Sequence, residues 1–492
     1  MTTTFSKNPD ALPQLIGEFE PLDAWQAHIS QIFYGLRAGR IRDYYQTFAS
    51  ADYRLAHALA ADYYARVLAR EQASGKGQAA RGKPTSEDPT PCLSPLASRL
   101  VVHEWGCGNG NLAACFLSHL RKLDHAGTVY PRVRYVLVDD QAVLLDAARN
   151  HPDLADHQDR LEVLCADVGD LASVTDRTVD RIICNELWNE LPTKLMLRNA
   201  GEVEEEYLRP NLSEAKHEEI QDWPGFVRAF EAKDSQALGR FPPFLEDIVW
   251  EKEYRKTEWK AVPYRKTITE FLKKIDDQVL VPVNLGAFAT VKEAKRVLAD
   301  GAIGFSSFDA GTADLAVLND PDKPCYGQFG GQYSFMVNFA LVEAVARHLG
   351  MATVTLESQR EFVGRNLGTN VLSVMDLLAA FPSADRLAPW EQDRLIIKTI
   401  RLLNQRYQSP YDRPMEFTLR QDMPTAERAE LEGILRSLKR DGIPDTVAYV
   451  SDEEVSGVLG ELETLGYDPH MVQAALRVHP QSVDYLHLYL NY

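Results

Sequence analysis

The chain has 492 residues, of which 45% are hydrophobic, and its formal net charge is −18. It can bury a large core and is longer than one typical domain, so we expect more than one folding unit. Binding to nucleic acid needs clustered Lys and Arg, and an acidic chain is a poor candidate for it. Composition therefore predicts an ordinary globular protein that does not bind nucleic acid.

The spacing of the cysteines bears on metal binding and disulfides, and the composition of the first 30 residues bears on cellular location. The six cysteines form no C-x-x-C pair and no Cys/His spacing typical of zinc. We therefore expect no metal site and no disulfide framework. Residues 1–30 contain several acids and only Lys7 as a strong cation, which argues against a targeting sequence, and no stretch is apolar enough to span a membrane. A cytoplasmic protein is expected.

The N-terminal part is predicted to be helical. Between residues 25 and 70, apolar side chains recur at three- and four-residue spacing, as on one face of a helix. Residues 73–95 are then rich in Gly, Lys, Pro, Ser and Thr, which is typical of a linker or surface loop. We expect residues 1–95 to form a helical lobe and a linker.

A glycine-rich turn follows, between a buried strand at residues 100–105 and a helix at residues 111–123. Its glycines recur at every second position, at Gly106, Gly108 and Gly110. Such a turn lets the backbone run close under a ligand, and the next helix offers free N–H groups. A dinucleotide fingerprint would need glycine where Asn111 stands, so a nicotinamide-dependent oxidoreductase is disfavoured.

Glu104, two residues before this turn, adds a carboxylate at the end of the strand, where a cationic or amino-bearing ligand would be stabilised. Glu104 and the G-x-G-x-G pattern together resemble the first motif of class I S-adenosylmethionine-dependent methyltransferases. The resemblance implies S-adenosyl-L-methionine as cofactor, bound by Glu104 and by the turn residues Gly106, Cys107, Gly108 and Gly110. A glycine-rich turn that binds nothing is the structural alternative.

Three more predicted strands each end in polar residues. They cover residues 133–138, 161–165 and 181–184, and helical segments lie between them. This alternation predicts a parallel, Rossmann-like doubly wound sheet, which binds ligands at the carboxyl ends of its strands. The polar residues at those ends are Asp139-Asp140, Asp167 and Asn185-Glu186.

The spacing of these residues suggests individual roles. Asp139, with Asp140 as the alternative, is placed to accept hydrogen bonds from both ribose hydroxyls of a nucleoside. Asp167 can accept one from the adenine amino group, with Val168 beside the ring. Each acid alone could equally cap a helix or lie in a solvated loop. Their repetition at several strand ends favours a ligand site.

The remaining chain is predicted to extend this domain. Residues 200–265 carry an acidic run followed by mixed charge, and we expect an insertion there that covers the substrate or presents a solvated face. A further strand is expected at residues 302–308 and an amphipathic helix at 335–349. The methyltransferase domain is thus expected at 96–380 and a C-terminal helical region at 381–492.

The segment 185–192, Asn-Glu-Leu-Trp-Asn-Glu-Leu-Pro, resembles the Asn-Glu-aromatic-aromatic-Asp-Ala-Leu-Pro motif of MidA-type methyltransferases. That family includes the mitochondrial protein arginine methyltransferase needed for complex I assembly. Segments 301–311 and 359–368 also resemble family motifs. The chain departs from the family at Asn189, where an Asp is usual, and at residues 332–338, which lack two acids and a histidine.

The resemblance implies an enzyme that methylates an acceptor, such as an arginine side chain of a protein, with S-adenosyl-L-methionine. Glu186 is expected to orient the acceptor and Asn185 to act beside it, as catalytic residues; Asn185 is also expected to contact the cofactor. Two alternatives remain open. The chain could be a non-catalytic S-adenosylmethionine-binding assembly factor, or it could methylate a small molecule.

Overall fold

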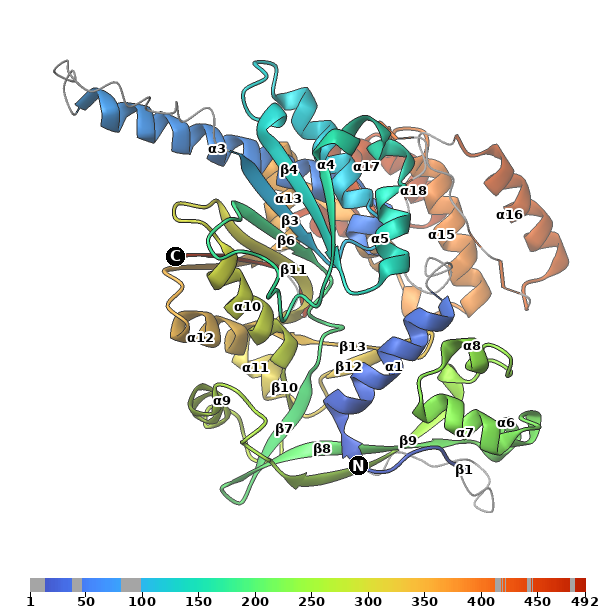
Figure 1. The fold of residues 1–492 in the computed structure, drawn as a ribbon. Coiled ribbons are helices and arrows are strands. Elements are labelled where there is room, and N and C mark those ends of the chain that lie inside the picture. The colour runs from blue at the N-terminus through green and yellow to red at the C-terminus, as the bar shows by residue number, and fades with distance from the viewer. Residues whose placement is uncertain are drawn as a thin grey trace.

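The structure is a computed structural model in which residues 14–37, 47–80, 99–411, 417, 419–420, 422–439, 444, 446–477 and 483–492 are described (Figure 1). Two large sheets, two small sheets of two strands each and a block of helices make up this part of the chain. None of its helices combines the length and the apolar character that a membrane crossing requires.

The larger sheet has eight strands and confirms the predicted doubly wound fold. Its order is β15-β18-β11-β6-β3-β4-β5, with β14 beside β11. Neighbours from β11 to β5 pair in parallel, whereas β18 is antiparallel to both of its neighbours. The strands are β3 (Leu100–Trp105), β4 (Val133–Asp139), β5 (Leu161–Cys165), β6 (Arg181–Asn185), β11 (Gly304–Thr312), β14 (Val337–Asn338), β15 (Thr353–Ser358) and β18 (Asp484–Asn491).

Helices cover both faces of this sheet, which explains why the inner strands β3, β4 and β6 are buried along almost their whole length. In β4, Tyr135 and Leu137 contribute to the core on one face, while Val136 and Val138 contribute to the core on the other. The first core includes residues of α3 (Arg54–Ala80), α4 (Asn111–Leu123), α5 (Ala142–Arg149) and α13 (Gln359–Leu367). The second includes residues of α9 (Arg265–Leu272), α10 (Leu285–Val297) and α12 (Phe339–His348).

A second, antiparallel sheet of six strands lies below the first in Figure 1. It consists of β1 (Gln14–Leu15), β2 (Glu20–Pro21), β7 (Lys194–Asn199), β8 (Glu202–Leu212), β9 (Ile248–Lys256) and β10 (Val281–Val283). The predicted insertion at about 200–265 is therefore too narrow, since paired strands extend from 194 to 283. Three short helices lie between β8 and β9 in the chain: α6 (Glu214–Glu219), α7 (Trp223–Glu231) and α8 (Ser235–Leu238).

The predicted N-terminal lobe is divided between the two sheets. α1 (Leu22–Arg37) packs on the second sheet through Ile29 and Phe33, which share a core with Leu208 of β8. α2 (Phe48–Ala51) and α3 pack on the larger sheet. The predicted linker is wrong at its beginning, because residues 73–80 belong to α3, and its residues 81–95 lie outside the described part of the chain.

The helix predicted at 335–349 begins later than expected. Residues 332–335 form β13, which pairs with β12 (Tyr326–Phe329), and the helix starts at Phe339. The side chain of Asn338 accepts a hydrogen bond from the backbone N–H of Leu341 at 3.1 Å and so caps this end. The short α11 (Leu315–Leu318) precedes these strands.

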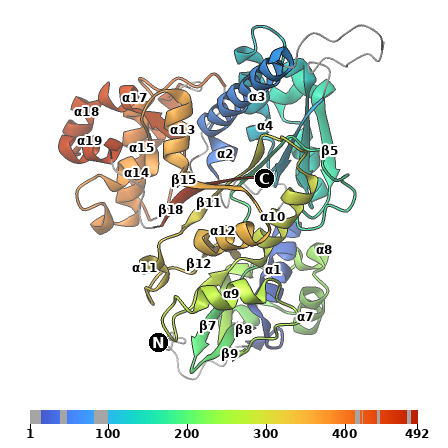
Figure 2. The same ribbon diagram turned by 90° about the vertical axis from the view of Figure 1, so that its left-hand side faces the viewer.

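The C-terminal region is mainly helical, but the prediction of helices up to Tyr492 is wrong at its end. The last strand, β18, enters the larger sheet between β11 and β15. The helical block lies beside that edge in Figure 2. Its elements are β16 (Val371–Ser373), α14 (Val374–Ala379), α15 (Pro389–Leu403), α16 (Thr425–Ser437), β17 (Tyr449–Ser451), α17 (Asp452–Ser456), α18 (Leu459–Leu465) and α19 (Pro469–Arg477).

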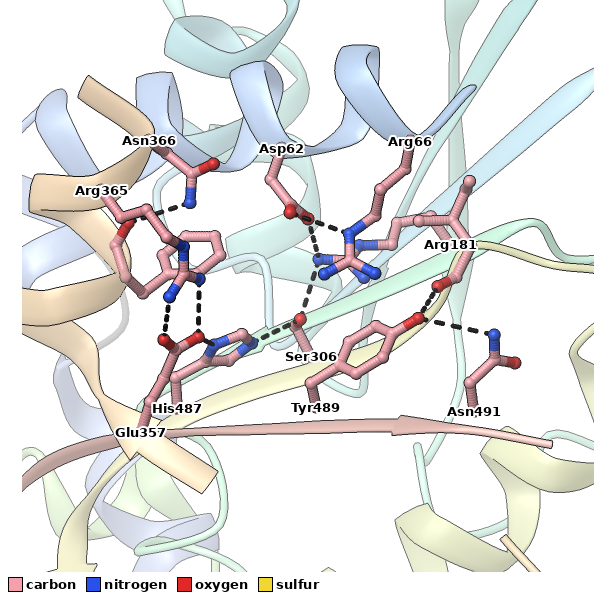
Figure 3. Close-up of polar contacts among 12 residues, drawn as sticks. Asp62, Arg66, Arg181, Ser306, Glu357, Arg365, Asn366, His487, Tyr489 and Asn491 are labelled. Atoms are coloured by element: carbon pink, nitrogen blue, oxygen red, sulfur yellow. Dashed lines mark hydrogen bonds and ion pairs between the residues drawn. The ribbon is translucent and has the colours of Figure 1, made fainter. Parts of the chain in front are cut away.

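A buried polar chain holds β18 in place (Figure 3). Arg181 of β6 pairs with Asp62 of α3 at 3.3 Å and donates to the Ser306 hydroxyl at 2.8 Å. Ser306 lies 2.7 Å from Nε2 of His487, whose Nδ1 lies 3.0 Å from Glu357. Burial lowers the pKa of His487, although the nearby Glu357 opposes this shift. A neutral ring with its proton on Nδ1 would donate to Glu357 and accept from the Ser306 hydroxyl.

The insertion of β18 predicts a large stability effect at Leu488, which is fully buried in this strand. We expect Leu488→Ala to lower the free energy of unfolding by about 2–5 kcal/mol, because it leaves a cavity inside the sheet. Val143→Ala, at a side chain that is 59% exposed, is the control and should change it by less than about 0.5 kcal/mol. Urea denaturation measures both. Equal effects would contradict a buried β18.

Candidate active site

A cavity of about 320 Å³ lies at the carboxyl ends of β3, β4 and β6. β3 lies between β4 and β6, so the strand order reverses there, and doubly wound sheets bind ligands at such a point. All the predicted site residues except Gly110 line this cavity: Glu104, Gly106, Cys107, Gly108, Asp139, Asp167, Val168, Asn185 and Glu186. Side chains that are far apart in sequence thus share one wall.

The three glycines of the turn all adopt left-handed backbone conformations, with φ of 73°, 51° and 78°. At Gly108 a Cβ atom would meet nothing within 4 Å, so this residue leaves open space beside the cavity. At Gly110 a Cβ atom would lie 2.7 Å from the carbonyl oxygen of Ala148. Gly110 therefore serves the packing of α4 against α5, while Gly108 keeps room at the cavity wall.

The carboxylates at the ends of β3 and β4 are enclosed. Burial raises the pKa of Glu104 to about 8, although the Tyr135 hydroxyl donates to it at 2.8 Å and partly opposes this rise. Burial likewise raises the pKa of Asp139 to about 6, and its Oδ1 accepts the backbone N–H of Gln141 at 3.0 Å. Asp140 also lines the cavity but is exposed to solvent.

The end of β5 contributes one exposed acid and one buried apolar side chain. Oδ1 of Asp167 accepts the backbone N–H of Gly169 at 2.7 Å, which fixes the turn after the strand. Val168 is 6% exposed and provides an apolar surface in the same wall. A polar group beside an apolar surface is a suitable environment for a heteroaromatic ring.

Glu186 occupies a strained and buried position at the end of β6. Its φ is 47°, a left-handed value that is rare outside glycine. Its Oε1 accepts the backbone N–H of Phe48 at 3.0 Å and the side-chain amide of Asn185 at 3.3 Å, and the side chain also hydrogen-bonds to Tyr485. Burial nevertheless raises its pKa to about 8. No helix begins directly after Glu186, so the carboxylate caps α2 rather than a helix of its own segment.

Asp309 of β11 supports the segment that follows Glu186. It is fully buried and accepts the backbone N–H groups of Trp188 at 2.8 Å and of Asn189 at 3.2 Å. Burial, together with the nearby charge of Glu186, raises the pKa of Asp309 well above its usual range. Two buried carboxyl groups therefore interact at this point, and the turn at 186–190 is held from behind.

The sequence analysis missed the cavity wall that α1 and α2 supply. Its residues are Gln26, Ala27, Ser30, Gln31, Tyr34, Thr47, Ala49 and Ser50. Asn111, at the place where a dinucleotide fingerprint has glycine, donates to the backbone oxygens of Ala49 at 2.6 Å and Asp52 at 2.9 Å. This amide therefore ties α2 to the glycine turn. No local pattern signals these contacts, because Asn111 and its acceptors lie about 60 residues apart in the sequence.

The charge of the cavity wall has one sign. Its acidic residues are Glu104, Asp139, Asp140, Asp167, Glu186 and Glu190. Among the described residues that line the cavity, none is Lys, Arg or His. Such a wall stabilises cations, and burial is the main cause of the raised pKa values of its enclosed carboxyl groups.

The described part of the chain contains no candidate metal site and no disulfide bond. No group of three or more His, Cys, Asp or Glu is placed there to hold a metal ion. The cysteines in it are free thiols, and Cys107 lines the cavity. Cys92 lies outside the described residues.

Comparison with known proteins finds a match to one protein family. Residues 91–313 match the model of a family described as "Putative S-adenosyl-L-methionine-dependent methyltransferase". The chain is similar to a Burkholderia thailandensis protein regarded as a methyl transferase and solved with S-adenosyl-homocysteine (16% identity, TM-score 0.45, 78% of this chain and 84% of that one). It is also similar to an uncharacterized Burkholderia thailandensis protein, with 16% identity and a TM-score of 0.40 over 77% of this chain and 90% of that one. No curated protein matches it.

The family match covers the part of the cavity that the larger sheet builds, but not the wall that α1 and α2 supply. It contains the glycine turn and the ends of β3, β4, β5 and β6, together with most of the second sheet. The chain is therefore an S-adenosyl-L-methionine-dependent methyltransferase, and S-adenosyl-L-methionine is its cofactor.

Proposed function

We propose that this enzyme methylates a cationic nitrogen acceptor, with the guanidinium group of a protein arginine as the preferred candidate. The observation that carries the proposal is the acidic wall of the cavity, in which Glu186 and Glu190 lie with no basic residue among the described lining. Carboxylates hold a guanidinium group through paired, charge-assisted hydrogen bonds. A MidA-type affiliation, inferred from segment 185–192, agrees with this acceptor, and we infer a cytoplasmic location.

The cavity residues suit the cofactor. Gly108 leaves open space beside the turn, and Oδ1 of Asn185 is buried without a hydrogen-bond partner. We assign the ribose hydroxyls to Asp139 and the adenine to Asp167 and Val168. The unpartnered oxygen of Asn185 would then accept a hydrogen bond from the cofactor's ammonium group. Glu104 lies behind the turn, and binding of the positively charged cofactor would favour its ionised form.

The chemistry is a displacement in which the bound cofactor supplies an electrophilic methyl group. The protein contributes alignment, which can be worth about 7–11 kcal/mol in favourable cases. Glu186 would orient the acceptor nitrogen toward the methyl group. Because burial raises its pKa to about 8, Glu186 is also suited to take up the proton that a guanidinium releases on methylation.

Asp139→Asn tests the assignment of the ribose. The exchange keeps the shape of the side chain and removes its charge, and a hydrogen bond to a charged group is worth about 1.5–3 kcal/mol. We expect the Kd for S-adenosylmethionine to rise at least tenfold by titration calorimetry. Asp140→Asn, at the exposed neighbour, is the matched control and should change Kd less than threefold. A larger loss at Asp140 would place the ligand contact one residue later.

Glu186→Gln tests the acceptor. We expect transfer of labelled methyl groups to arginine-containing peptides and lysate proteins to fall at least 100-fold, because the variant can neither pair with a guanidinium nor take its proton. The Kd for the cofactor should stay within threefold of the native value. Glu162→Gln, at an exposed residue of β5, is the control. A fully active Glu186→Gln enzyme would remove this residue from the mechanism.

The pH dependence of cofactor binding tests the electrostatics. The carboxyl groups assigned to the cofactor titrate in an accessible range, since the pKa of Glu104 is about 8 and that of Asp139 about 6, so both are increasingly neutral as the pH falls. A cation prefers their charged forms, and binding therefore releases protons. We expect affinity for S-adenosylmethionine to increase from pH 5.5 to pH 7.5, by up to about tenfold per unit for each carboxyl group that loses its proton, and affinity for the thioether product, which lacks the sulfonium charge, to increase less. Equal pH profiles for the two ligands would contradict this.

A further inference from the structure

A second and larger cavity lies outside the region of the family match. Its volume is about 1870 Å³, and we call it the C-terminal groove. Residues of α13, β16, α14, β17, α17 and α19 line it, and Asp484 and Tyr485 of β18 form its floor. These elements form the helical block beside the edge of the larger sheet in Figure 2. No step of the proposed cofactor site uses this groove.

The groove extends to two residues that contact Glu186, the residue to which we assign the methyl acceptor. Phe48 and Tyr485 both line the groove, and their rings meet edge to face with centroids 4.9 Å apart. Both also contact Glu186: the backbone N–H of Phe48 donates to it at 3.0 Å, and the Tyr485 side chain hydrogen-bonds to it. Glu186 itself lines the cofactor cavity. The wall between the two cavities is therefore about one side chain thick.

Acidic residues outnumber basic residues in the lining of the groove. Its acidic residues are Glu357, Glu361, Asp376, Asp452, Glu453 and Asp484, against Arg360, Arg365 and Arg477. Two of these arginines serve the fold: Arg360 donates to backbone oxygens of Val371 and Ala475, and Arg365 pairs with Glu357. The Arg365–Glu357 pair occupies one acid as well as one arginine, so five acids and two arginines of the groove lie outside it. The remaining surface favours a basic ligand.

Two methionines give the groove apolar contacts as well. Met375 of α14 is 51% exposed and Met471 of α19 is 53% exposed, and both line it. Methionine side chains are flexible and adapt to varied partners, and they are common on protein surfaces that bind peptides. Exposed apolar side chains beside carboxylates match a peptide better than a small polar molecule.

We propose that the C-terminal groove docks the methyl acceptor, and that this acceptor is a polypeptide segment with basic side chains. The inference rests on the proposed function and deepens it. Small-molecule sites usually measure about 300–1,000 Å³, and the groove exceeds that range. A basic side chain of the docked segment would approach Glu186 from the groove side, where Phe48 and Tyr485 cover it and would have to move apart, while the cofactor approaches from the opposite side.

The experiment uses the full-length enzyme and a fluorescein-labelled peptide of alternating glycine and arginine. Fluorescence anisotropy gives the Kd of the peptide, and calorimetry gives the Kd of S-adenosylmethionine. Asp376→Lys/Glu453→Lys reverses two charges in the groove. Glu461→Lys/Glu463→Lys makes the same change on α18, where both residues are exposed and lie outside the groove. Both pairs remove an acid from the first turn of a helix, so their effects on folding are comparable.

We expect the groove variant to bind the arginine peptide at least tenfold more weakly than the native enzyme, with an unchanged Kd for the cofactor. The α18 variant should bind both ligands normally. A peptide with glutamate in place of arginine should not bind. Met375→Ser/Met471→Ser repeats the test without a charge change and should weaken peptide binding about threefold to tenfold.

The outcomes separate the groove from the proposed function. Absence of peptide binding to the native enzyme, or equal Kd values for the groove and α18 variants, would overturn the groove proposal. Methyl transfer to the peptide with an unchanged KM in the groove variant would also overturn it, and would leave the proposed function intact. Groove-dependent binding without any methyl transfer to the bound arginine would support the docking site and refute the acceptor that we assign.

Discussion

The buried carboxylate of Glu186 is the constraint on which the rest of the site depends. Its partners are the adjacent Asn185 and two residues from distant parts of the chain, Phe48 at the start of α2 and Tyr485 in β18. A carboxylate taken out of water is costly unless hydrogen bonds or charges compensate. These bonds compensate only in part, which is why the pKa stays near 8. The arrangement is stable without a ligand and is better stabilised by a cation.

The same reasoning extends to the cavity as a whole. Glu104 and Asp139 are also enclosed and carry raised pKa values, and no basic side chain lies among the described residues that line the cavity. Repulsion between such acids opposes the folded state, so the protein gives up some stability to hold the site. A positively charged cofactor relieves this repulsion, whereas the product that has lost its methyl group relieves less of it. The electrostatics thus favour both cofactor capture and product release.

The C-terminal strand connects this site to the helical block. β18 is held between β11 and β15 by backbone pairing and by the buried chain from Arg181 through Ser306 and His487 to Glu357. That anchoring fixes Tyr485 against Glu186. The C-terminal helices then surround the groove on the other side of Tyr485. A strand that completes the sheet therefore also sets the distance between the two cavities.

The sequence by itself determined the parts of the protein that follow from local patterns. Apolar runs located β3 and β5 with their observed bounds, the G-x-G-x-G spacing identified the turn, and the register placed Asp139 rather than Asp140 in the more enclosed position. Each of these depends on residues that are close in the chain. The tertiary structure alone decided the pairing of α1 with the second sheet, the insertion of β18 and the contact of Tyr485 with Glu186. These features depend on side chains hundreds of residues apart. Such contacts stabilise the protein only after folding has brought those side chains together.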